Sequence, residues 1–546
     1  MDTVLTRVVA IAAVTLASGQ IASTIQNRVS EGTEFLLPAV SPAERGDLRA
    51  LYRPGTDAPL WVDAAGRPND RAREALALLD HVADDGLDPA DFRVGELDGM
   101  ASALDGHPSA AGVAEFDVTL SLGMLRYLRQ LHLGRVDPRT LGFRIPAPTE
   151  RHDFPAMLRS ALANGTLAEV AARLSPPFDQ YRALRRMLAR YQSLAEDATL
   201  PALPPPTVVL RPGGRYANLG ALSRRLIALG DLADRLVPSE GDAVYDDALV
   251  DAVKRFQARH GLQGDGIVGR QTHAALDCPL AWRVRQIELA LERLRWLPDL
   301  PADRLVAVDI PMFRLWTFDV VPTAAPATLD MSVIVGHAFD TETPTLVEEM
   351  RYIIFRPYWY IPTSILRAEI LPALKRSPGY LPAHEMEIFA GPADDARPVP
   401  TTRENLALLR KGLLNVRQIP GPRNPLGLVK FIFPNDAHVY MHGTPEPELF
   451  RQTRRDFSHG CVRIEDPVAM AEWALGDQPE WPREAILSAM AASEPRRVDL
   501  TRPITVVFFY STAVVTPDDG LLRFADDIYG QDVKLDRALA RRPARP

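Results

Sequence analysis

The spacing of hydrophobic residues changes along the chain, and this change predicts where helices give way to strands. Between residues 42 and 196, apolar positions recur at the three- and four-residue spacing of an amphipathic helix. The stretches 71–82 and 116–133 show this spacing most clearly. No cluster of catalytic residue types stands out in this region. We therefore expect a helical scaffold domain over 42–196.

A proline-rich stretch at 200–207 predicts a linker, because consecutive prolines stiffen the chain and forbid helix. A compact unit is expected after it, over 208–277, with an apolar helical face at Leu249, Val253 and Phe256. A glycine-rich turn separates this face from a further short helix. The stretch 281–297 then predicts an amphipathic connecting helix.

After this helix the pattern becomes that of short strands rich in β-branched and aromatic residues. These strands are expected at 305–310, 313–318, 331–335, 352–360, 429–433, 438–442 and 504–510. The pattern predicts a β-rich domain over 303–530. A mostly helical insertion at 361–426 interrupts it, and an insertion of this length between strands is often a lid or substrate cap. The fold class is thus a multi-domain α+β protein.

The first residues, 1–24, predict a signal segment. A short polar start with Arg7 precedes an apolar run from Val8 to Ala17 and then small residues, a pattern typical of secretion. An uncleaved membrane anchor and a buried N-terminal helix are the alternatives. We expect an exported protein.

Composition argues against two classes of protein, the nucleic-acid-binding proteins and the disulfide-rich proteins. The chain has 546 residues and a net charge of −8, so it lacks the basic character expected of a nucleic-acid-binding protein. Its two cysteines, Cys278 and Cys461, exclude a disulfide framework and could form only one bridge. Such a bridge would remove the free thiol that Cys461 needs to act as a nucleophile.

Candidate chemistry gathers between His438 and Pro467, where Ser458, His459 and Gly460 directly precede Cys461. A cysteine needs a base at neutral pH, because only a few per cent of a free thiol is ionised there. Two histidines could serve as this base. His459 is two residues from the cysteine, and His442 ends a predicted strand from which it could face the cysteine across a sheet.

The backbone around this cysteine also fits catalysis. Gly460 permits a tight turn that could present amide donors to an oxyanion. Asp466 and Pro467 predict the start of a helix, with the aspartate as N-cap and the proline in the first turn.

Two other interpretations of the same residues stay open. His438, His442, His459 and Cys461 are of types that ligate zinc, although structural zinc sites usually show tighter pairs. An inert buried cysteine is the second alternative, and the polar neighbours Ser458, His459 and Arg463 make a poor core for it.

His442, followed after fifteen residues by Ser-His-Gly-Cys-Val-Arg at 458–463, resembles the signature of the L,D-transpeptidases with a YkuD-type catalytic domain. The surroundings resemble the large multi-domain branch of that family, which carries a peptidoglycan-binding domain and a capping insertion. The stretch 245–276 itself resembles the small three-helix peptidoglycan-binding domain. A spacer with the same fold is the alternative for that unit.

The resemblance implies a periplasmic enzyme that joins peptidoglycan stem peptides. The cysteine would attack the carbonyl of the third, diamino-acid residue of a tetrapeptide stem, release D-alanine, and pass the acyl group to an acceptor amine. It further implies peptidoglycan glycan as a partner, carbapenems as inhibitors, and no metal or organic cofactor.

The resemblance also assigns roles to particular residues of this chain. Cys461 would be the nucleophile, His442 the proton donor and acceptor, and His459 an orienting residue. The amides of Gly460 and Cys461 would form the oxyanion hole. The expected substrate contacts are Tyr440, Ser458, Arg463, Arg423 and Asn424.

Two positions depart from the family pattern. Gly443 stands where an aspartate often follows the first histidine, and Tyr360 where an asparagine often follows a Tyr-Trp pair. These departures bear on histidine orientation and on donor preference. Hydrolysis of the same acyl-enzyme, attachment of a protein to the wall, and a non-catalytic wall-binding role are the alternative functions.

Overall fold

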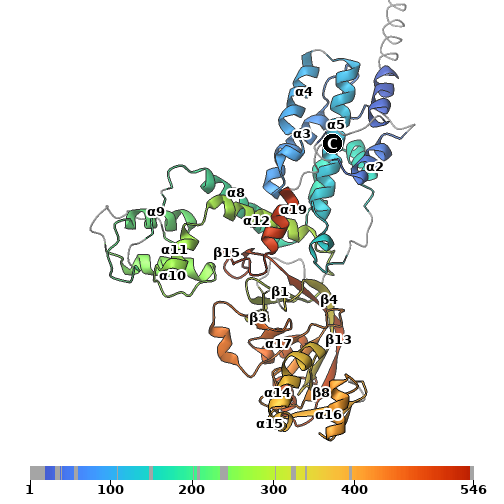
Figure 1. Ribbon diagram of the computed structural model, residues 1–546. Helices are drawn as coiled ribbons and strands as arrows, with labels where there is room; N and C mark the ends of the chain where they lie inside the picture. The colour runs from blue at the N-terminus through green and yellow to red at the C-terminus, as the bar shows by residue number, and fades with distance from the viewer. Residues whose placement is uncertain are drawn as a thin grey trace, which may run out of the picture. The chain divides into compact units, whose positions relative to one another are not determined.

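The computed structural model describes residues 19–30, 37, 40–53, 59–106, 108–146, 152–200, 202–205, 209–233, 244–301, 303–320, 327–338, 341–392 and 396–540. The chain forms two compact units (Figure 1). The first comprises Met1–Asp299 with Ser511–Pro546, and the second comprises Leu300–Tyr510.

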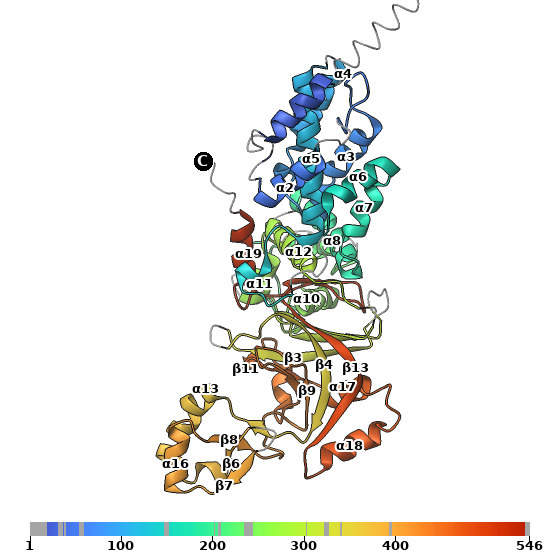
Figure 2. The same ribbon diagram turned by 90° about the vertical axis from the view of Figure 1, so that its right-hand side faces the viewer.

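The N-terminal helices of the first unit share one hydrophobic core, as their spacing predicted. The long helix α5 (Ala110–Leu133) is central to it, and its Leu120, Met124 and Leu128 are fully buried. Helices α3, α4 and α5 lie side by side in both ribbon views (Figures 1 and 2). The other helices of this region are α2 (Pro42–Leu51), α3 (Asp70–Asp80), α4 (Val94–Gly106), α6 (Phe154–Asn164), α7 (Leu167–Leu174) and α8 (Asp179–Glu196).

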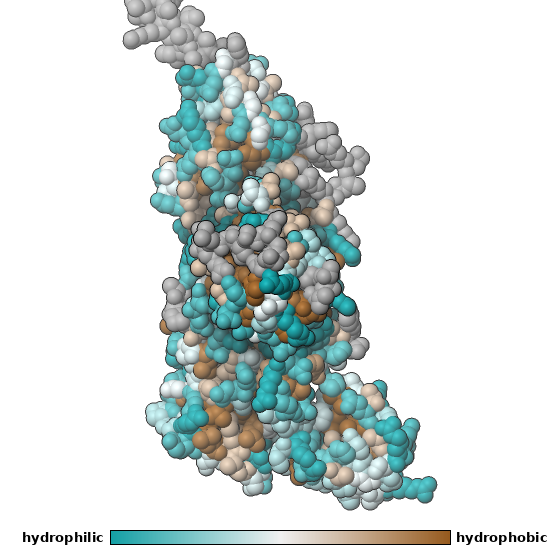
Figure 3. Space-filling model, turned by 90° about the vertical axis from the view of Figure 1, so that its left-hand side faces the viewer, coloured by the Kyte–Doolittle hydropathy of each residue, from teal (hydrophilic) through white to brown (hydrophobic). Residues whose placement is uncertain are grey.

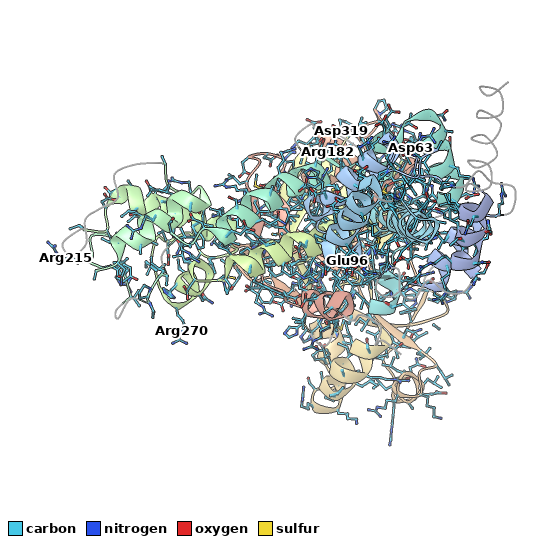
Figure 4. The ribbon with its side chains drawn as sticks, turned by 90° about the horizontal axis from the view of Figure 1, so that it is seen from above. Asp63, Glu96, Arg182, Arg215, Arg270 and Asp319 are labelled. Atoms are coloured by element: carbon cyan, nitrogen blue, oxygen red, sulfur yellow. The ribbon has the colours of Figure 1, made fainter. Side chains whose placement is uncertain are left out.

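The next helices form a small unit around its own core. They are α9 (Leu219–Leu229), α10 (Asp247–Arg259) and α11 (Arg270–Leu276), which agrees with the three-helix prediction. Leu249, Val253 and Phe256 of α10 are fully buried in this core. Leu203, from the predicted linker, packs into the same core, so the described part of that stretch is anchored. Arg215 and Arg270 project from this unit (Figure 4).

The C-terminal segment belongs to the first unit. Strands β14 (Ala513–Val515) and β15 (Leu522–Phe524) pack on α8 and on the connecting helix α12 (Leu280–Arg295), and helix α19 (Gln531–Ala540) follows. The predicted boundary of the β-rich domain at residue 530 is therefore wrong. Its last strand ends at 509, and the apolar side chains of the segment after it are buried on helices of the first unit.

The second unit is built on a nine-stranded sheet that closes on itself. The strand order is β11-β3-β12-β10-β9-β4-β13-β1-β2, and β2 also pairs with β3. The strands are β1 (Leu305–Asp309), β2 (Arg314–Phe318), β3 (Leu329–Gly336), β4 (Leu346–Phe355), β9 (Val429–Ile432), β10 (Met441–His442), β11 (Asp456–Ser458), β12 (Val462–Ile464) and β13 (Arg496–Phe509). Helices α17 (Pro467–Ala474) and α18 (Arg483–Ala491) follow β12. The sequence pattern found most of these strands but missed the three-residue strands β11 and β12.

The insertion in the second unit contains more strand than the sequence predicted (Figure 2). Four short strands form a separate antiparallel sheet in the order β5-β8-β6-β7. They are β5 (Trp359–Tyr360), β6 (Met386–Ala390), β7 (Arg397–Val399) and β8 (Asn415–Gln418). The helices are α13 (Thr363–Ile365), a π-helix (Leu366–Ile370), α14 (Leu371–Arg376), α15 (Tyr380–Ala383) and α16 (Arg403–Arg410). The two halves share one apolar core, so the insertion is mixed and the description "mostly helical" is incomplete.

No described helix is both long enough and apolar enough to cross a lipid bilayer. Most of the predicted signal segment, 1–24, lies outside the described residues. On the face drawn in Figure 3, hydrophobic and hydrophilic patches alternate over the surface.

Gly336, at the end of β3, lies where the second unit has no room for a side chain. A Cβ atom there would lie 1.9 Å from the carbonyl oxygen of Thr341. We expect Gly336→Ala to destabilise the unit by about 2–3 kcal/mol, the cost typical of overpacking. Gly379→Ala is the matched control, because a Cβ there meets nothing within 4 Å. Equal shifts of the two variants in thermal unfolding would contradict the expectation.

Candidate active site

The register of three neighbouring strands brings the candidate residues together. His442 of β10 pairs with Lys430 of β9 on one side and with Arg463 of β12 on the other. Paired residues on adjacent strands project from the same face of a sheet, and positions two apart on one strand share a face. Tyr440 and Cys461 therefore lie on this face too. The opposite face carries the fully buried Phe431, Met441 and Val462.

His442 is held in a defined orientation. Its Nδ1 lies 2.6 Å from the carbonyl oxygen of Gly443. A carbonyl can only accept a hydrogen bond, so Nδ1 carries the proton and Nε2 of the neutral ring keeps its lone pair. Because the Gly443 contact uses the backbone, orientation of this histidine does not require the aspartate that the family pattern often has at 443.

The surroundings of His442 favour the neutral ring. Burial, together with the positive charges of Arg463 and Lys430, lowers its pKa to about 3, although the carbonyls of Gly443 and Leu426 oppose this shift. The ring is 4% exposed. At neutral pH His442 is therefore a neutral imidazole with a proton-accepting nitrogen.

The thiol of Cys461 sits against Tyr440. The backbone amide and the hydroxyl of Tyr440 both hydrogen-bond the sulfur. Burial raises the pKa of Cys461, and these hydrogen bonds and the charges of Lys430 and Arg463 partly offset that rise. Cys461 is a free cysteine, as is Cys278, so no bridge blocks it.

A tight turn presents the cysteine. Gly460 has φ +109, a conformation that other residues rarely adopt. The Ser458 hydroxyl donates to the carbonyl of Cys461 at 2.5 Å and accepts from the amide of Gly460 at 3.1 Å. The Thr343 hydroxyl donates to the carbonyl of Gly460 at 2.8 Å, and the Thr341 hydroxyl donates to the carbonyl of Ser458 at 3.0 Å. These four hydrogen bonds thus fix the turn before any substrate binds.

These bonds change two of the predicted roles. Ser458 was expected to contact substrate, but its hydroxyl braces the turn and the residue is 4% exposed. Gly460 was expected to donate its amide to an oxyanion, but that amide is already bonded to Ser458. The amide of Cys461 forms no hydrogen bond with any residue that the structure describes, so it is the better-placed oxyanion donor.

The charged residues expected at the substrate are mostly paired. Arg463 bonds Glu446 at 2.8 Å. Arg423 bonds Glu385 at 2.9 Å within the insertion. Nε2 of His459 lies 3.3 Å from Oε1 of Glu369 in the insertion, and both of these side chains are more than half exposed. An exposed pair of this kind contributes little to stability, so it can open readily.

Asn424 does not face a substrate. It is fully buried, and its side chain donates to the carbonyls of Pro357 and Ile419 and accepts from the amide of Leu426. The residue therefore stabilises the backbone where the insertion returns to the sheet. The expected substrate contact for Asn424 is wrong because all of its polar atoms are engaged inside the protein.

The zinc interpretation receives no support from this arrangement. His438 is exposed in a turn, with its amide bonded to the carbonyl of Asn435. Over the described part of the chain, no three His, Cys, Asp or Glu side chains gather as metal ligands would.

Sequence reasoning missed three residues that the fold brings to the site, namely Lys430, Thr341 and Thr343. The alternation of buried Val429 and Phe431 with Lys430 could have placed the lysine on the opposite face of its strand. For the two threonines no local signal exists, because they reach the cysteine turn from more than 100 residues away.

Comparison with known protein families agrees with this geometry. Residues 303–499 match the L,D-transpeptidase catalytic domain, residues 215–276 match a peptidoglycan binding domain, and residues 46–188 match a scaffold domain. Residues 303–499 thus form an L,D-transpeptidase catalytic domain of the YkuD type. The protein combines this β-rich domain with a helical N-terminal region and a peptidoglycan-binding domain.

Individual relatives are more distant. A Haemophilus influenzae protein named "Putative L,D-transpeptidase" is 25% identical over 301 residues, which span 54% of this chain and 58% of that protein. The crystal structure of an L,D-transpeptidase from Stackebrandtia nassauensis is 14% identical with a TM-score of 0.23, covering 56% of this chain and 96% of that one. A second, from Xylanimonas cellulosilytica, is 15% identical with a TM-score of 0.17, covering 57% and 100%.

The raised pKa of Cys461 predicts a slow-reacting thiol in the free protein. In a Cys278→Ser background, we expect the rate of alkylation by iodoacetamide to reach half its maximum at a higher pH than that of a free cysteine thiol, because burial raises the pKa of Cys461. At pH 7 the rate should be at most a few per cent of its plateau, because only the thiolate reacts. A midpoint well below pH 8 would show that a thiolate is already stabilised at rest and would contradict the expectation.

Proposed function

We propose that this protein is a peptidoglycan L,D-transpeptidase in which Cys461 is the nucleophile and His442 the proton donor and acceptor. The observation that carries the proposal is the placement of these two residues on one face of adjacent strands, with Nδ1 of His442 committed to the Gly443 carbonyl. That contact leaves Nε2 as the nitrogen that can take the thiol proton.

In the first half-reaction Sγ of Cys461 attacks the carbonyl carbon of the third residue of a tetrapeptide stem. The thiol proton passes to Nε2 of His442 as the carbon–sulfur bond forms. The carbonyl oxygen becomes an oxyanion, for which the amide of Cys461 is the available donor. The carbon–nitrogen bond then breaks, and D-alanine leaves as an amine that takes the proton from His442.

The low pKa of His442 suits the second of these proton transfers. A group that is protonated only reluctantly is a strong acid once it holds the proton, and an amine needs an acid in order to leave. The same low pKa makes His442 a weak base toward the resting thiol. Proton transfer is therefore expected together with attack on the carbonyl, without a stored thiolate–imidazolium pair.

In the second half-reaction an acceptor amine from another stem attacks the thioester. His442 takes a proton from this amine and returns it to sulfur as the carbon–sulfur bond breaks. The product is a cross-link between two third-position diamino acids. The same thioester given to water or to a protein amine would produce a hydrolase or a protein-attachment enzyme, and the mass of the product distinguishes these outcomes.

Further parts of the proposal concern recognition and location. The peptidoglycan-binding domain supports glycan as the partner that brings the catalytic unit to its substrate. Tyr440 contacts the sulfur, so it would lie beside the acyl group. Arg463 and Arg423 would meet stem carboxylates only after exchanging their partners Glu446 and Glu385. The polar-then-apolar start of the sequence supports export to the periplasm.

Removal of either reacting group should abolish the acyl transfer. We expect Cys461→Ala and His442→Ala to form no cross-linked dimer from purified disaccharide tetrapeptide, measured by mass spectrometry, because the first lacks the nucleophile and the second the proton acceptor. Cys278→Ala is the matched control and should retain full activity. Dimer formed by the Cys461→Ala variant would refute the mechanism.

A carbapenem should mark the same cysteine. We expect incubation to raise the intact mass by that of one carbapenem, through a thioester formed as its ring opens, and the Cys461→Ala variant should show no adduct. Failure of the wild-type protein to form the adduct would instead favour the non-catalytic wall-binding alternative.

A further inference from the structure

Lys430 lies on the catalytic face next to His442, yet the sequence motif assigns it no role. It is the β9 residue that pairs with His442, and its Nζ lies 5.4 Å from the ring centroid of Tyr440. A cation over a tyrosine ring is attracted by the negative face of the ring. The ammonium is therefore held beside the residue whose amide and hydroxyl bond the sulfur of Cys461.

Lys430 also carries an uncompensated charge. No carboxylate among the described residues forms an ion pair with it, whereas Arg463, the other cation on this face, is bonded to Glu446. Burial lowers the pKa of Lys430, and the neighbouring sulfur raises it. A partly buried ammonium without a carboxylate partner costs free energy. Any negative charge that forms next to it would therefore be stabilised.

Three groups influence the charge on the sulfur, namely Tyr440 directly before β10, Arg463 of β12 and Lys430 of β9. His442 of β10 lies on the same face, between Arg463 and Lys430. Burial keeps both Tyr440 and His442 neutral, because it raises the pKa of the tyrosine well above its usual value and lowers the pKa of the histidine to about 3. With Arg463 offset by Glu446, Lys430 supplies the free positive charge.

We propose that Lys430 is a positioning residue for the nucleophile, whose ammonium stabilises the negative charge that develops on Cys461 as the thiol proton leaves. The proton still passes from Sγ to Nε2 of His442, and Lys430 keeps its own proton throughout. The same positive charge disfavours an imidazolium at His442, so it drives that proton onward to the leaving amine. The role in turnover rests on the proposed transpeptidase mechanism, but the effect on the thiol does not.

The test is the pH dependence of iodoacetamide alkylation in the Cys278→Ser background, which needs no stem peptide. Lys430→Met keeps the length of the side chain and removes the charge. We expect it to raise the midpoint by about one pH unit and to slow alkylation about tenfold below that midpoint. Lys430→Arg restores the charge and should keep the midpoint near that of the parent.

Two comparisons make the result specific. Lys411→Met removes an exposed lysine of the insertion and should leave the profile unchanged. Circular dichroism checks that each variant is folded, and Lys430→Gln replaces Lys430→Met if the methionine variant is not. A midpoint that does not move in the folded neutral variant overturns the proposal, as does an equal shift in Lys430→Arg.

Kinetics with disaccharide tetrapeptide distinguish this proposal from a role of Lys430 in substrate binding. If Lys430 instead binds a carboxylate of the stem, the neutral variant raises KM while the alkylation midpoint stays in place, and this result also overturns the proposal. A shifted midpoint in a protein that forms no cross-link would retain the Lys430 assignment and reject the proposed function.

Discussion

The register between β9, β10 and β12 is the constraint on which the catalytic face depends. Strand side chains alternate between faces, so a slip of one residue in β10 would turn His442 inward and bring Met441 out to the site. The fully buried Phe431, Met441 and Val462 oppose such a slip, because it would expose them. The apolar interior of the closed sheet thus determines where the polar chemistry occurs.

Burial then sets the protonation states on that face. Removing water disfavours every charged form, which raises the pKa of Cys461 and lowers the pKa of His442. The resting pair is therefore a neutral thiol and a neutral imidazole. Tyr440 and Lys430 act in the other direction by favouring negative charge on sulfur. In the proposed mechanism, this unreactive resting state gives way to a nucleophile only when a substrate carbonyl is present.

Rigidity is distributed unevenly around this pair. The cysteine turn is tied by Ser458, Thr341 and Thr343 through bonds of 2.5–3.1 Å. The insertion, in contrast, meets the turn through the exposed pair between His459 and Glu369, which can break at little cost. The turn that carries Cys461 is thus held firmly, while its contact with the insertion through His459 and Glu369 can open without disturbing it.

The sequence by itself determined the order of the domains and indicated Cys461 and His442 as the candidate reacting pair. The Cys461 motif with His442, the helical periodicity and most strands could be read locally, because they depend on neighbours in the chain. Tertiary structure alone decided that the Gly460 amide is occupied, that Asn424 is buried, that residues after 510 join the first unit, and that Lys430 lies next to His442 and over the ring of Tyr440. Each of these depends on contacts between distant segments, and no local pattern encodes which segments pair.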